Sequence, residues 1–241
     1  MKSKTKQELY ESLGLLYGDG CLKGKVEFSN CNPELVKKIF NFIKSFGINT
    51  DKIKTYIKTY RSVSEITDEE ILHYWLKYLK GAKRKNFYKI QRRKRVTQNI
   101  RKRKLPPKQG LAEIMVYNKQ LCRKMNLLMK NAQKDVLKDK IKAIFFLRGI
   151  IAAEGSVKLV KEKLKEVRIS SCKPKEQEYI RNVLKVVGLI PCKARYDYYI
   201  AISGIKQFEI LEKNAFISLH YEKEKKFSEG LKNLRSSLLG E

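Results

Sequence analysis

The spacing of apolar residues predicts amphipathic helices in two windows of related sequence, residues 29–47 and 170–188. In each window a proline stands where the helix would begin and a glycine follows where it would end, the usual asymmetry of helix termini. The apolar positions recur at three- and four-residue intervals and therefore share one helix face. These stripes are Leu35, Ile39, Phe42, Ile43 and Phe46, and Ile180, Val183, Leu184 and Val187. Each window is predicted to be a strand end followed by a helix.

The two windows are copies of one another at an offset of 141 residues. Their seven identities are Ser29/Ser170, Cys31/Cys172, Pro33/Pro174, Ile39/Ile180, Asn41/Asn182, Lys44/Lys185 and Gly47/Gly188. A second pair lies upstream at an offset of 135, where LGLLYGDG (residues 13–20) matches RGIIAAEG (residues 148–155). The two offsets differ by six, so the second copy has six extra residues between these two matches. They fall in a segment predicted to be a hairpin, residues 21–30 in the first copy and 157–171 in the second.

A weaker third match aligns residues 119–121 with residues 206–208, each opening a predicted helix after a short strand. The first copy then contains about 54 additional residues, placed at about 61–110. The chain is therefore predicted to be α+β, with a first half at 1–135 and a second at 136–241. Each half is predicted to run helix, hairpin, helix, two further strands, helix.

The strong positive charge of the chain limits the classes of molecule that it is expected to bind. The chain has 54 Lys and Arg against 25 Asp and Glu, a formal net charge of +29. Nucleic acid is the polyanion that this charge favours first, and an anionic membrane surface comes second. The most apolar stretch, residues 143–153, is interrupted by Arg148 and is too short to span a bilayer. No secretory signal pattern opens the chain, and the five cysteines contain no C-x-x-C pair, so we expect an intracellular protein without a disulfide framework.

The two upstream segments share a glycine spacing and an acid. Gly14 and Gly18 lie four residues apart, as do Gly149 and Ala153, so small residues would share one face of each helix. Two helices packed closely and in parallel on those faces would bring Asp19 and Glu154 together at their C-terminal ends, where the helix dipole disfavours negative charge. A solvated acid followed by a capping glycine explains one such segment. Two copies favour a site for divalent cations, for which carboxylate oxygens are suitable ligands.

LGLLYGDG and RGIIAAEG resemble the two signature motifs of the LAGLIDADG homing endonucleases, in their single-chain form with two pseudo-symmetric halves. The resemblance implies αββαββα halves, a central pair of motif helices, and two antiparallel sheets that form a saddle over DNA. It further implies that Asp19 and Glu154, with the adjoining Gly20 and Gly155, hold Mg²⁺ or another divalent cation such as Mn²⁺, and that both strands are cut across the minor groove.

The same resemblance implies further site residues. A polar side chain at the end of the second strand corresponds to Asn30 and Ser171, although serine is shorter than the usual glutamine or asparagine. A lysine near each site corresponds, for the site of the first copy, to Lys140 or alternatively Lys138. In the second half it corresponds to Lys225, with Lys223 and Lys226 as alternatives.

Basic strand positions supply candidate DNA contacts, since alternate residues of a strand share one face. Solvated sheet edges are the alternative for any single lysine. In the insertion, Thr67 and Glu70 predict a capped helix whose Trp75 belongs to the core, and residues 83–104 hold twelve basic residues and no acid. That run predicts either a phosphate-binding arm or a solvated one. The candidates are Lys23, Lys25, Ser29, Lys52, Lys54, Lys58, Arg92, Arg93, Arg95, Lys158, Arg168, Ser170, Lys193 and Arg195.

Three functions follow from the resemblance. The first is a monomeric, site-specific endonuclease acting on a long double-stranded DNA target. The second is an RNA-binding maturase that assists intron splicing, which the unusual basic insertion keeps open. The third is a DNA-binding descendant without metals, against which the presence of both motif acids argues.

Overall fold

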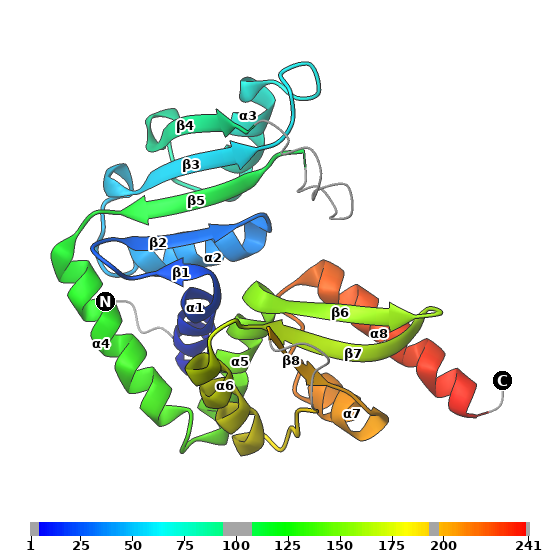
Figure 1. Cartoon of the computed structure of the whole chain (residues 1–241). Coiled ribbons are helices and arrows are strands. Elements are labelled where there is room, and N and C mark those ends of the chain that lie inside the picture. Colours follow the sequence, from blue (N-terminus) through cyan, green and yellow to red (C-terminus); the bar gives the residue numbers. More distant parts are fainter. Residues whose placement is uncertain (1–4, 94–107, 193–197, 240–241) are drawn as a thin grey trace. The chain divides into compact units, whose positions relative to one another are not determined.

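The computed structural model describes residues 5–93, 108–192 and 198–239 (Figure 1). The chain forms two compact units, one built from residues 19–127 and the other from the described residues before 19 and after 127. The fold is α+β, as predicted. In the described residues no helix is both long and apolar enough to cross a membrane.

A mixed five-stranded sheet forms the centre of the first unit. Its strands are β1 (Gly20–Cys21), β2 (Val26–Asn30), β3 (Lys54–Thr59), β4 (Phe87–Arg92) and β5 (Leu111–Val116), in the order β1-β2-β5-β3-β4. Neighbouring strands are antiparallel except β3 and β4, which are parallel. The prediction of purely antiparallel sheets is therefore wrong here, because the insertion adds β4 to the edge beside β3. Lys52 lies in a short 3₁₀ turn, η1 (Thr50–Lys52), rather than in the predicted strand.

One face of this sheet is apolar and packed. Phe28, Ile57 and Ile114 are fully buried on it. The stripe of α2 (Pro33–Lys44) is buried as predicted, and Asn32 caps that helix by accepting from the amides of Glu34 and Leu35. The insertion contributes α3 (Asp68–Tyr78), which begins with the predicted capping box of Thr67 and Glu70. Trp75 of α3 is fully buried, and its ring N–H donates to the carbonyl of Gln109 at 2.9 Å.

The second unit contains both acidic-motif helices up to Gly18, α1 (Lys6–Asp19) and α5 (Lys140–Glu154). Its sheet runs β6 (Gly155–Val160), β7 (Lys163–Ser170) and β8 (Tyr199–Ile202), all antiparallel. A single bridge joins Cys192 to Ala201, and the rest of the predicted strand at 192–198 lies mostly outside the described residues. The helices that complete this part of the chain are α6 (Pro174–Val186), α7 (Ile205–Lys213) and α8 (Tyr221–Leu238), together with the end of α4 (Lys119–Asp135).

Helix α8 is an element that the repeat does not predict. It packs against β6 and β7, with Phe227 and Leu231 buried. Gly230 allows this approach, because a Cβ there would lie 2.4 Å from a methyl group of Leu159.

The registers of the two hairpins confirm the sequence repeat. Gly20 pairs with Phe28 in the first unit, and Gly155 pairs with Ile169 in the second. These residues are related by the offsets of 135 and 141 read from the sequence, so the six extra residues lengthen the second hairpin toward its tip. Both hairpins therefore leave the motif helix in the same way.

Candidate active site

The motif helices α1 and α5 pack backbone to backbone within the second unit. A Cβ on Gly14 would lie 2.1 Å from the carbonyl oxygen of Phe146, closer than any side chain tolerates. A Cβ on Gly149 would meet the carbonyl oxygen of Glu11 at 2.3 Å. Only glycine fits these positions, which explains a residue that otherwise costs a helix about 1 kcal/mol relative to alanine.

The two helices run in parallel, because contacts along α1 advance in step with contacts along α5. Near the C-terminal end, a Cβ on Gly18 would lie 2.7 Å from the Cβ of Ala153 and 3.1 Å from the Cγ of Glu154. The predicted close, parallel packing of small residues is confirmed. Asp19 follows Gly18 directly in the chain as the first residue of the other unit.

A buried ion pair, which the sequence pattern does not predict, joins the same helices. Glu11 is 1% exposed and lies 3.5 Å from a guanidinium nitrogen of Arg148. Arg148 also donates to the carbonyl of Asn214, through Nε at 3.1 Å and Nη2 at 2.8 Å. The arginine that interrupts the apolar segment thus binds α5 to α1 and to the end of α7.

Asn30 is placed beside the first motif acid. Its amide nitrogen donates to Oδ2 of Asp19 at 2.6 Å, while its oxygen accepts from the backbone N–H of Asn32 at 2.8 Å. The second bond fixes which end of the amide faces Asp19. Ser171, at the equivalent position, is buried and donates instead to Glu176 at 3.4 Å. The two halves therefore hold their strand-end side chains differently.

The donor chemistry of these residues fits a hard divalent cation. Asp19 and Glu154 offer carboxylate oxygens, and the amide of Asn30 orients the first of them. Mg²⁺ and Mn²⁺ take such oxygen ligands in preference to thiols. Among the described residues no group of three or more His, Cys, Asp and Glu could hold a metal ion. Either carboxylate would therefore need further oxygen ligands, from the backbone or from solvent, to hold a cation.

No family profile matches the sequence, and no match among curated proteins is found. Solved structures do match. Full-length DUF199/WhiA from Thermatoga maritima is 12% identical with a TM-score of 0.54, over 98% of this chain and 62% of that chain. The N-terminal LAGLIDADG domain of DUF199/WhiA is 11% identical with a TM-score of 0.49, over 89% of this chain and 85% of that chain. This chain has the LAGLIDADG fold.

The homing endonuclease I-DmoI is also similar, with 15% identity and a TM-score of 0.48, over 89% of this chain and 98% of that chain. Three other structures of I-DmoI are complexes with DNA, two in the presence of Mn and one with Ca. At these identities the likeness concerns the fold alone. Helices α1 and α5 carry the two sequence motifs and are named the LAGLIDADG helices after them.

The structure corrects the choice of Lys140 as an active-site lysine. Lys140 is the first residue of α5 and Glu154 is the last, so the two lie about 21 Å apart along the helix axis. The alternative, Lys138, precedes the same end of the helix. Neither lysine can approach the end of the LAGLIDADG helices that the acids occupy.

The candidate lysines of the second half lie on α8, and Lys223 and Lys225 make very different contacts. The ammonium of Lys223 donates to the carbonyl oxygens of Ile151 at 3.2 Å and Ala152 at 2.6 Å, in the last turn of α5. Lys225 is 60% exposed and forms an ion pair of 3.9 Å with Glu229. Lys223, rather than Lys225, therefore reaches the acidic end of α5, where a cation complements the helix dipole.

The open face of the first sheet carries the predicted lysines, but acids accompany them. Lys25 pairs with Glu27, and Lys58 pairs with Glu113. Burial raises the pKa of Glu113, and the hydrogen bond and charge of Lys58 outweigh it, so that the pKa is lowered overall. Lys54 is exposed on the same face, and Lys23 is exposed in the first hairpin. Ser29 is half-buried on β2, opposite Glu113.

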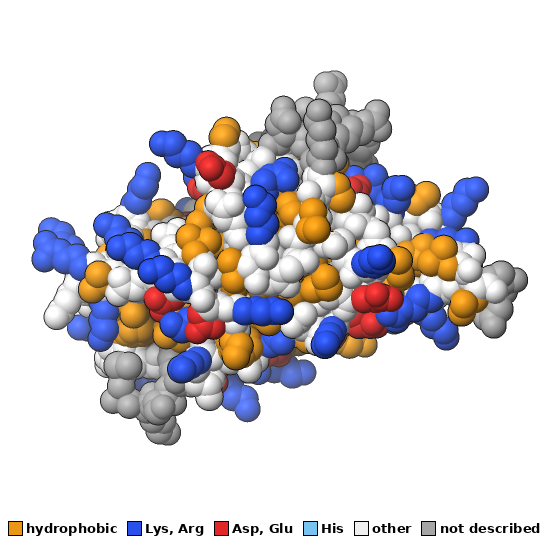
Figure 2. Space-filling view, turned by 90° about the horizontal axis from the view of Figure 1, so that it is seen from below, with side chains coloured by type: hydrophobic (Ala, Val, Ile, Leu, Met, Phe, Trp, Pro, Cys, Tyr) orange, Lys and Arg blue, Asp and Glu red, His pale blue; other side chains and the backbone are white. Residues whose placement is uncertain are grey.

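The second sheet repeats this neutralisation. Lys158 lies 3.2 Å from Glu166, and Nε of Arg168 donates to the same acid at 2.9 Å. Arg168 also stacks over the ring of Tyr199 at 4.5 Å. Ser170 is exposed at the end of β7. Lys and Arg side chains outnumber acidic ones on the face shown in Figure 2.

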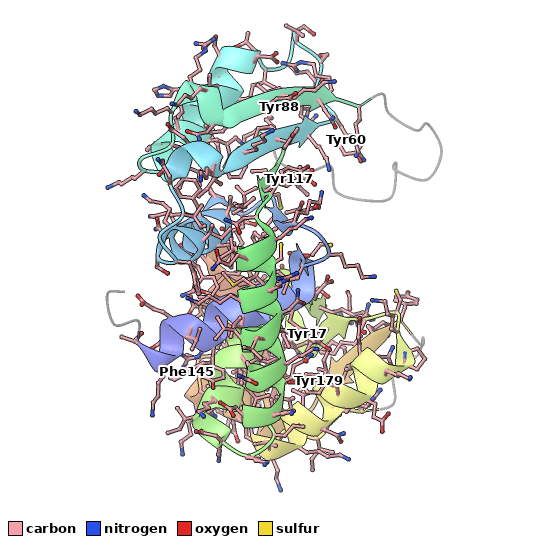
Figure 3. The ribbon with its side chains drawn as sticks, turned by 90° about the vertical axis from the view of Figure 1, so that its left-hand side faces the viewer. Tyr17, Tyr60, Tyr88, Tyr117, Phe145 and Tyr179 are labelled. Carbon is pink, nitrogen blue, oxygen red and sulfur yellow. The ribbon has the colours of Figure 1, made fainter. Side chains whose placement is uncertain are left out.

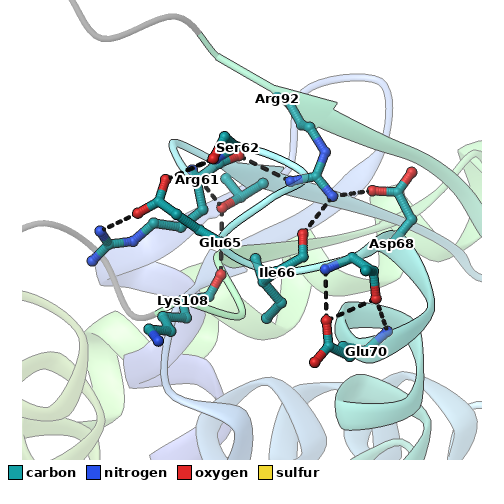
Figure 4. Close-up of polar contacts among 10 residues, drawn as sticks. Arg61, Ser62, Glu65, Ile66, Asp68, Glu70, Arg92 and Lys108 are labelled. Carbon is teal, nitrogen blue, oxygen red and sulfur yellow. Dashed lines mark hydrogen bonds and ion pairs between the residues drawn. The ribbon is translucent and has the colours of Figure 1, made fainter.

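One arginine of the basic insertion, Arg92, stabilises the fold of the first unit. Arg92 donates to the carbonyls of Arg61 and Ile66, both at 2.9 Å, and pairs with Asp68 at the start of α3 (Figure 4). Its guanidinium therefore ties the end of β4 to the preceding loop. Arg93 is exposed beyond it. The candidates Arg95, Lys193 and Arg195 lie outside the described residues.

Proposed function

We propose that this protein is a site-specific endonuclease that cuts both strands of a long double-stranded DNA target with a divalent cation. The observation that carries the proposal is the pair of LAGLIDADG helices, which pack through Gly14 and Gly149 and each end in a carboxylate residue. The packing needs glycine, but nothing in the packing needs an acid at both helix ends. The repeated acids are therefore best explained by a shared chemical task.

Asp19 and Glu154 would hold Mg²⁺ or Mn²⁺, alongside Gly20 and Gly155. When bound, such an ion can activate water and stabilise the leaving oxygen of a phosphodiester. Asn30 orients Asp19 through its hydrogen bond, and Lys223 places a positive charge at the end of α5. The lysines of the two open sheet faces would bind DNA phosphates on either side of the cleavage position. We further propose that the protein acts as a monomer inside the cell, with its halves divided near residue 135.

The test is cleavage of a random-sequence duplex library in the presence of Mg²⁺, followed by sequencing of the cut molecules. The wild-type protein is expected to cut one long site, whereas Asp19→Asn and Glu154→Gln each abolish cutting and still bind that duplex. Glu162→Gln is the matched control, because Glu162 lies at the exposed tip of the second hairpin. Cutting that survives either motif substitution would refute the assignment of the acids.

Two other outcomes would support the alternatives. Stimulation of intron splicing by the Asp19→Asn variant, without any DNA cleavage by the wild type, would indicate a maturase. Specific binding without cleavage or splicing would indicate a DNA-binding descendant.

A further inference from the structure

The inserted strand β4 is fixed firmly to the first sheet at both of its ends. Before it, the buried amide of Asn86 donates to the carbonyls of Thr50 at 2.8 Å and Ile53 at 3.1 Å. At its end, Arg92 is held by the loop and by α3. Strand β4 is thus an integral strand of the sheet, and it widens the open face by one strand.

Three tyrosines from three neighbouring strands meet on that widened face. Tyr88 of β4 lies against Tyr56 of β3, with ring centroids 5.2 Å apart. The ammonium of Lys54, also on β3, lies 5.0 Å from the ring centre of Tyr88 and 5.7 Å from that of Tyr117, which follows β5. Figure 3 shows Tyr88 and Tyr117 with their side chains.

Lys54 differs electrostatically from Lys25 and Lys58, which lie on the same face. Lys25 and Lys58 lie against carboxylates, which cancel their charge locally. Lys54 lies over aromatic rings, which orient its ammonium, and among the described residues no carboxylate pairs with it. Tyr88 is 64% exposed and Tyr117 is 61% exposed, so the hydroxyl-bearing rings are open to a partner.

We propose that Lys54, Tyr88 and Tyr117 form a phosphate-binding site for duplex DNA, through which the insertion lengthens the contacted target. The proposal rests on the DNA binding included in the proposed function. A cation and phenolic hydroxyls are the donors that DNA phosphates accept from. Because Lys54 already covers the faces of Tyr88 and Tyr117, these rings would serve a phosphate better than a stacked base.

Binding without cleavage tests the site, using a duplex selected by binding from a random-sequence pool in EDTA. Lys54→Met is expected to lower the slope of log K against log salt by about 0.9, the value for one lost phosphate contact. Lys77→Met is the control, since Lys77 is exposed on α3, the helix whose Ile71 and Trp75 are buried. Tyr88→Ala is expected to weaken binding about tenfold and to shorten nuclease protection at one end of the duplex.

Two results would overturn the site. Lys54→Met could leave the salt slope equal to that of Lys77→Met, or the protected length could be unchanged in Tyr88→Ala. Equal affinity for the single strand of the same sequence would indicate base stacking and would also overturn it. Tyr88→Phe keeps the ring and should retain the placement of Lys54, so a folded but weak-binding Tyr88→Phe variant assigns the contact to the hydroxyl.

The failures of the two proposals are distinguishable. Cleavage of a selected site with an unchanged Tyr88→Ala footprint would leave the endonuclease proposal intact and remove the phosphate site. A shortened Tyr88→Ala footprint on DNA that the wild type never cuts would support the phosphate site and remove the endonuclease proposal.

Discussion

Gly149 lies so close to Glu11 that no side chain fits between them, since a Cβ on Gly149 would meet the Glu11 carbonyl oxygen at 2.3 Å and the amide nitrogen of Leu15 at 2.6 Å. Both obstacles are backbone atoms, which cannot move without separating α1 from α5. The LAGLIDADG helices are therefore packed backbone against backbone at this position.

Gly149→Ala is expected to lower the free energy of unfolding by about 1–3 kcal/mol or more, as overpacking does. Gly230→Ala is the matched control, because the atom nearest to its Cβ would be a methyl group of Leu159 at 2.4 Å, whereas the nearest backbone atom, the amide nitrogen of Leu164, lies at 3.3 Å. That methyl can rotate away, and alanine favours the helix. Urea unfolding compares the two variants, and similar losses would mean that the backbone contact is not limiting.

The difference between Asn30 and Ser171 predicts unequal effects on cleavage. Asn30→Ala removes the hydrogen bond that orients Asp19, and we expect a fall in cleavage rate of about tenfold or more. Ser171→Ala should change the rate by less than about threefold, because its hydroxyl faces Glu176. Single-turnover cleavage of a selected site measures both. A larger effect at Ser171 would show that DNA binding rearranges that side chain.

Lys223 and Lys225 are two residues apart on α8, which makes them a matched pair. Lys223→Met deprives the last turn of α5 of its cation and is expected to destabilise the fold by about 1–2 kcal/mol. Lys225→Met should change stability by less than about 0.5 kcal/mol, as exposed pairs do. Thermal unfolding and cleavage assays of both variants would check the assignment, which an equally inactive Lys225→Met would contradict.

Glu113 is expected to restrain DNA binding, because its carboxylate neutralises Lys58 on the open face of the first sheet. Glu113→Gln should tighten binding and make the salt slope steeper by about 0.9, through the release of one lysine to a phosphate. Glu65→Gln serves as the control, since Glu65 pairs with Arg61 in an exposed loop. Unchanged binding in Glu113→Gln would place Lys58 outside the DNA contact.

Acid should destabilise the protein through His220. Burial and then the charge of Lys223 lower the pKa of His220 from its ordinary 6.5 to about 4. The unfolded chain therefore takes up this proton at a higher pH than the folded chain. The contribution to stability is complete above about pH 6.5 and is lost as the pH falls toward about 4. Urea unfolding at about pH 7.5 and about pH 5 should show a smaller loss in His220→Gln than in the wild type.

The repeat made the architecture of the motif helices and hairpins predictable from the sequence. The two offsets relate Gly20 to Gly155 and Phe28 to Ile169, and the strand registers agree with them. The four-residue spacing from Gly14 to Gly18, repeated from Gly149 to Ala153, predicted the close helix packing. These features depend on local spacing repeated twice.

What escaped prediction depends on contacts between distant residues. The pairing of Lys58 with Glu113 follows from strand register, and the parallel entry of β4 beside β3 follows from how the insertion returns to the sheet. The error over Lys140 is different. The predicted helix already placed that lysine one helix length from Glu154, so geometry within a single element would have excluded it.

The placement of β4 also has a consequence for self-association. Unpaired edge strands are templates on which identical chains add to one another and aggregate. At one edge of the first sheet stands β1, which is only two residues long. At the other stands β4, which carries Lys89 and Arg92 and is interrupted by a bulge opposite Thr55 and Tyr56. Strand β1 is too short, and β4 too charged and irregular, to pair with a strand of another chain. Neither edge of this sheet therefore favours aggregation.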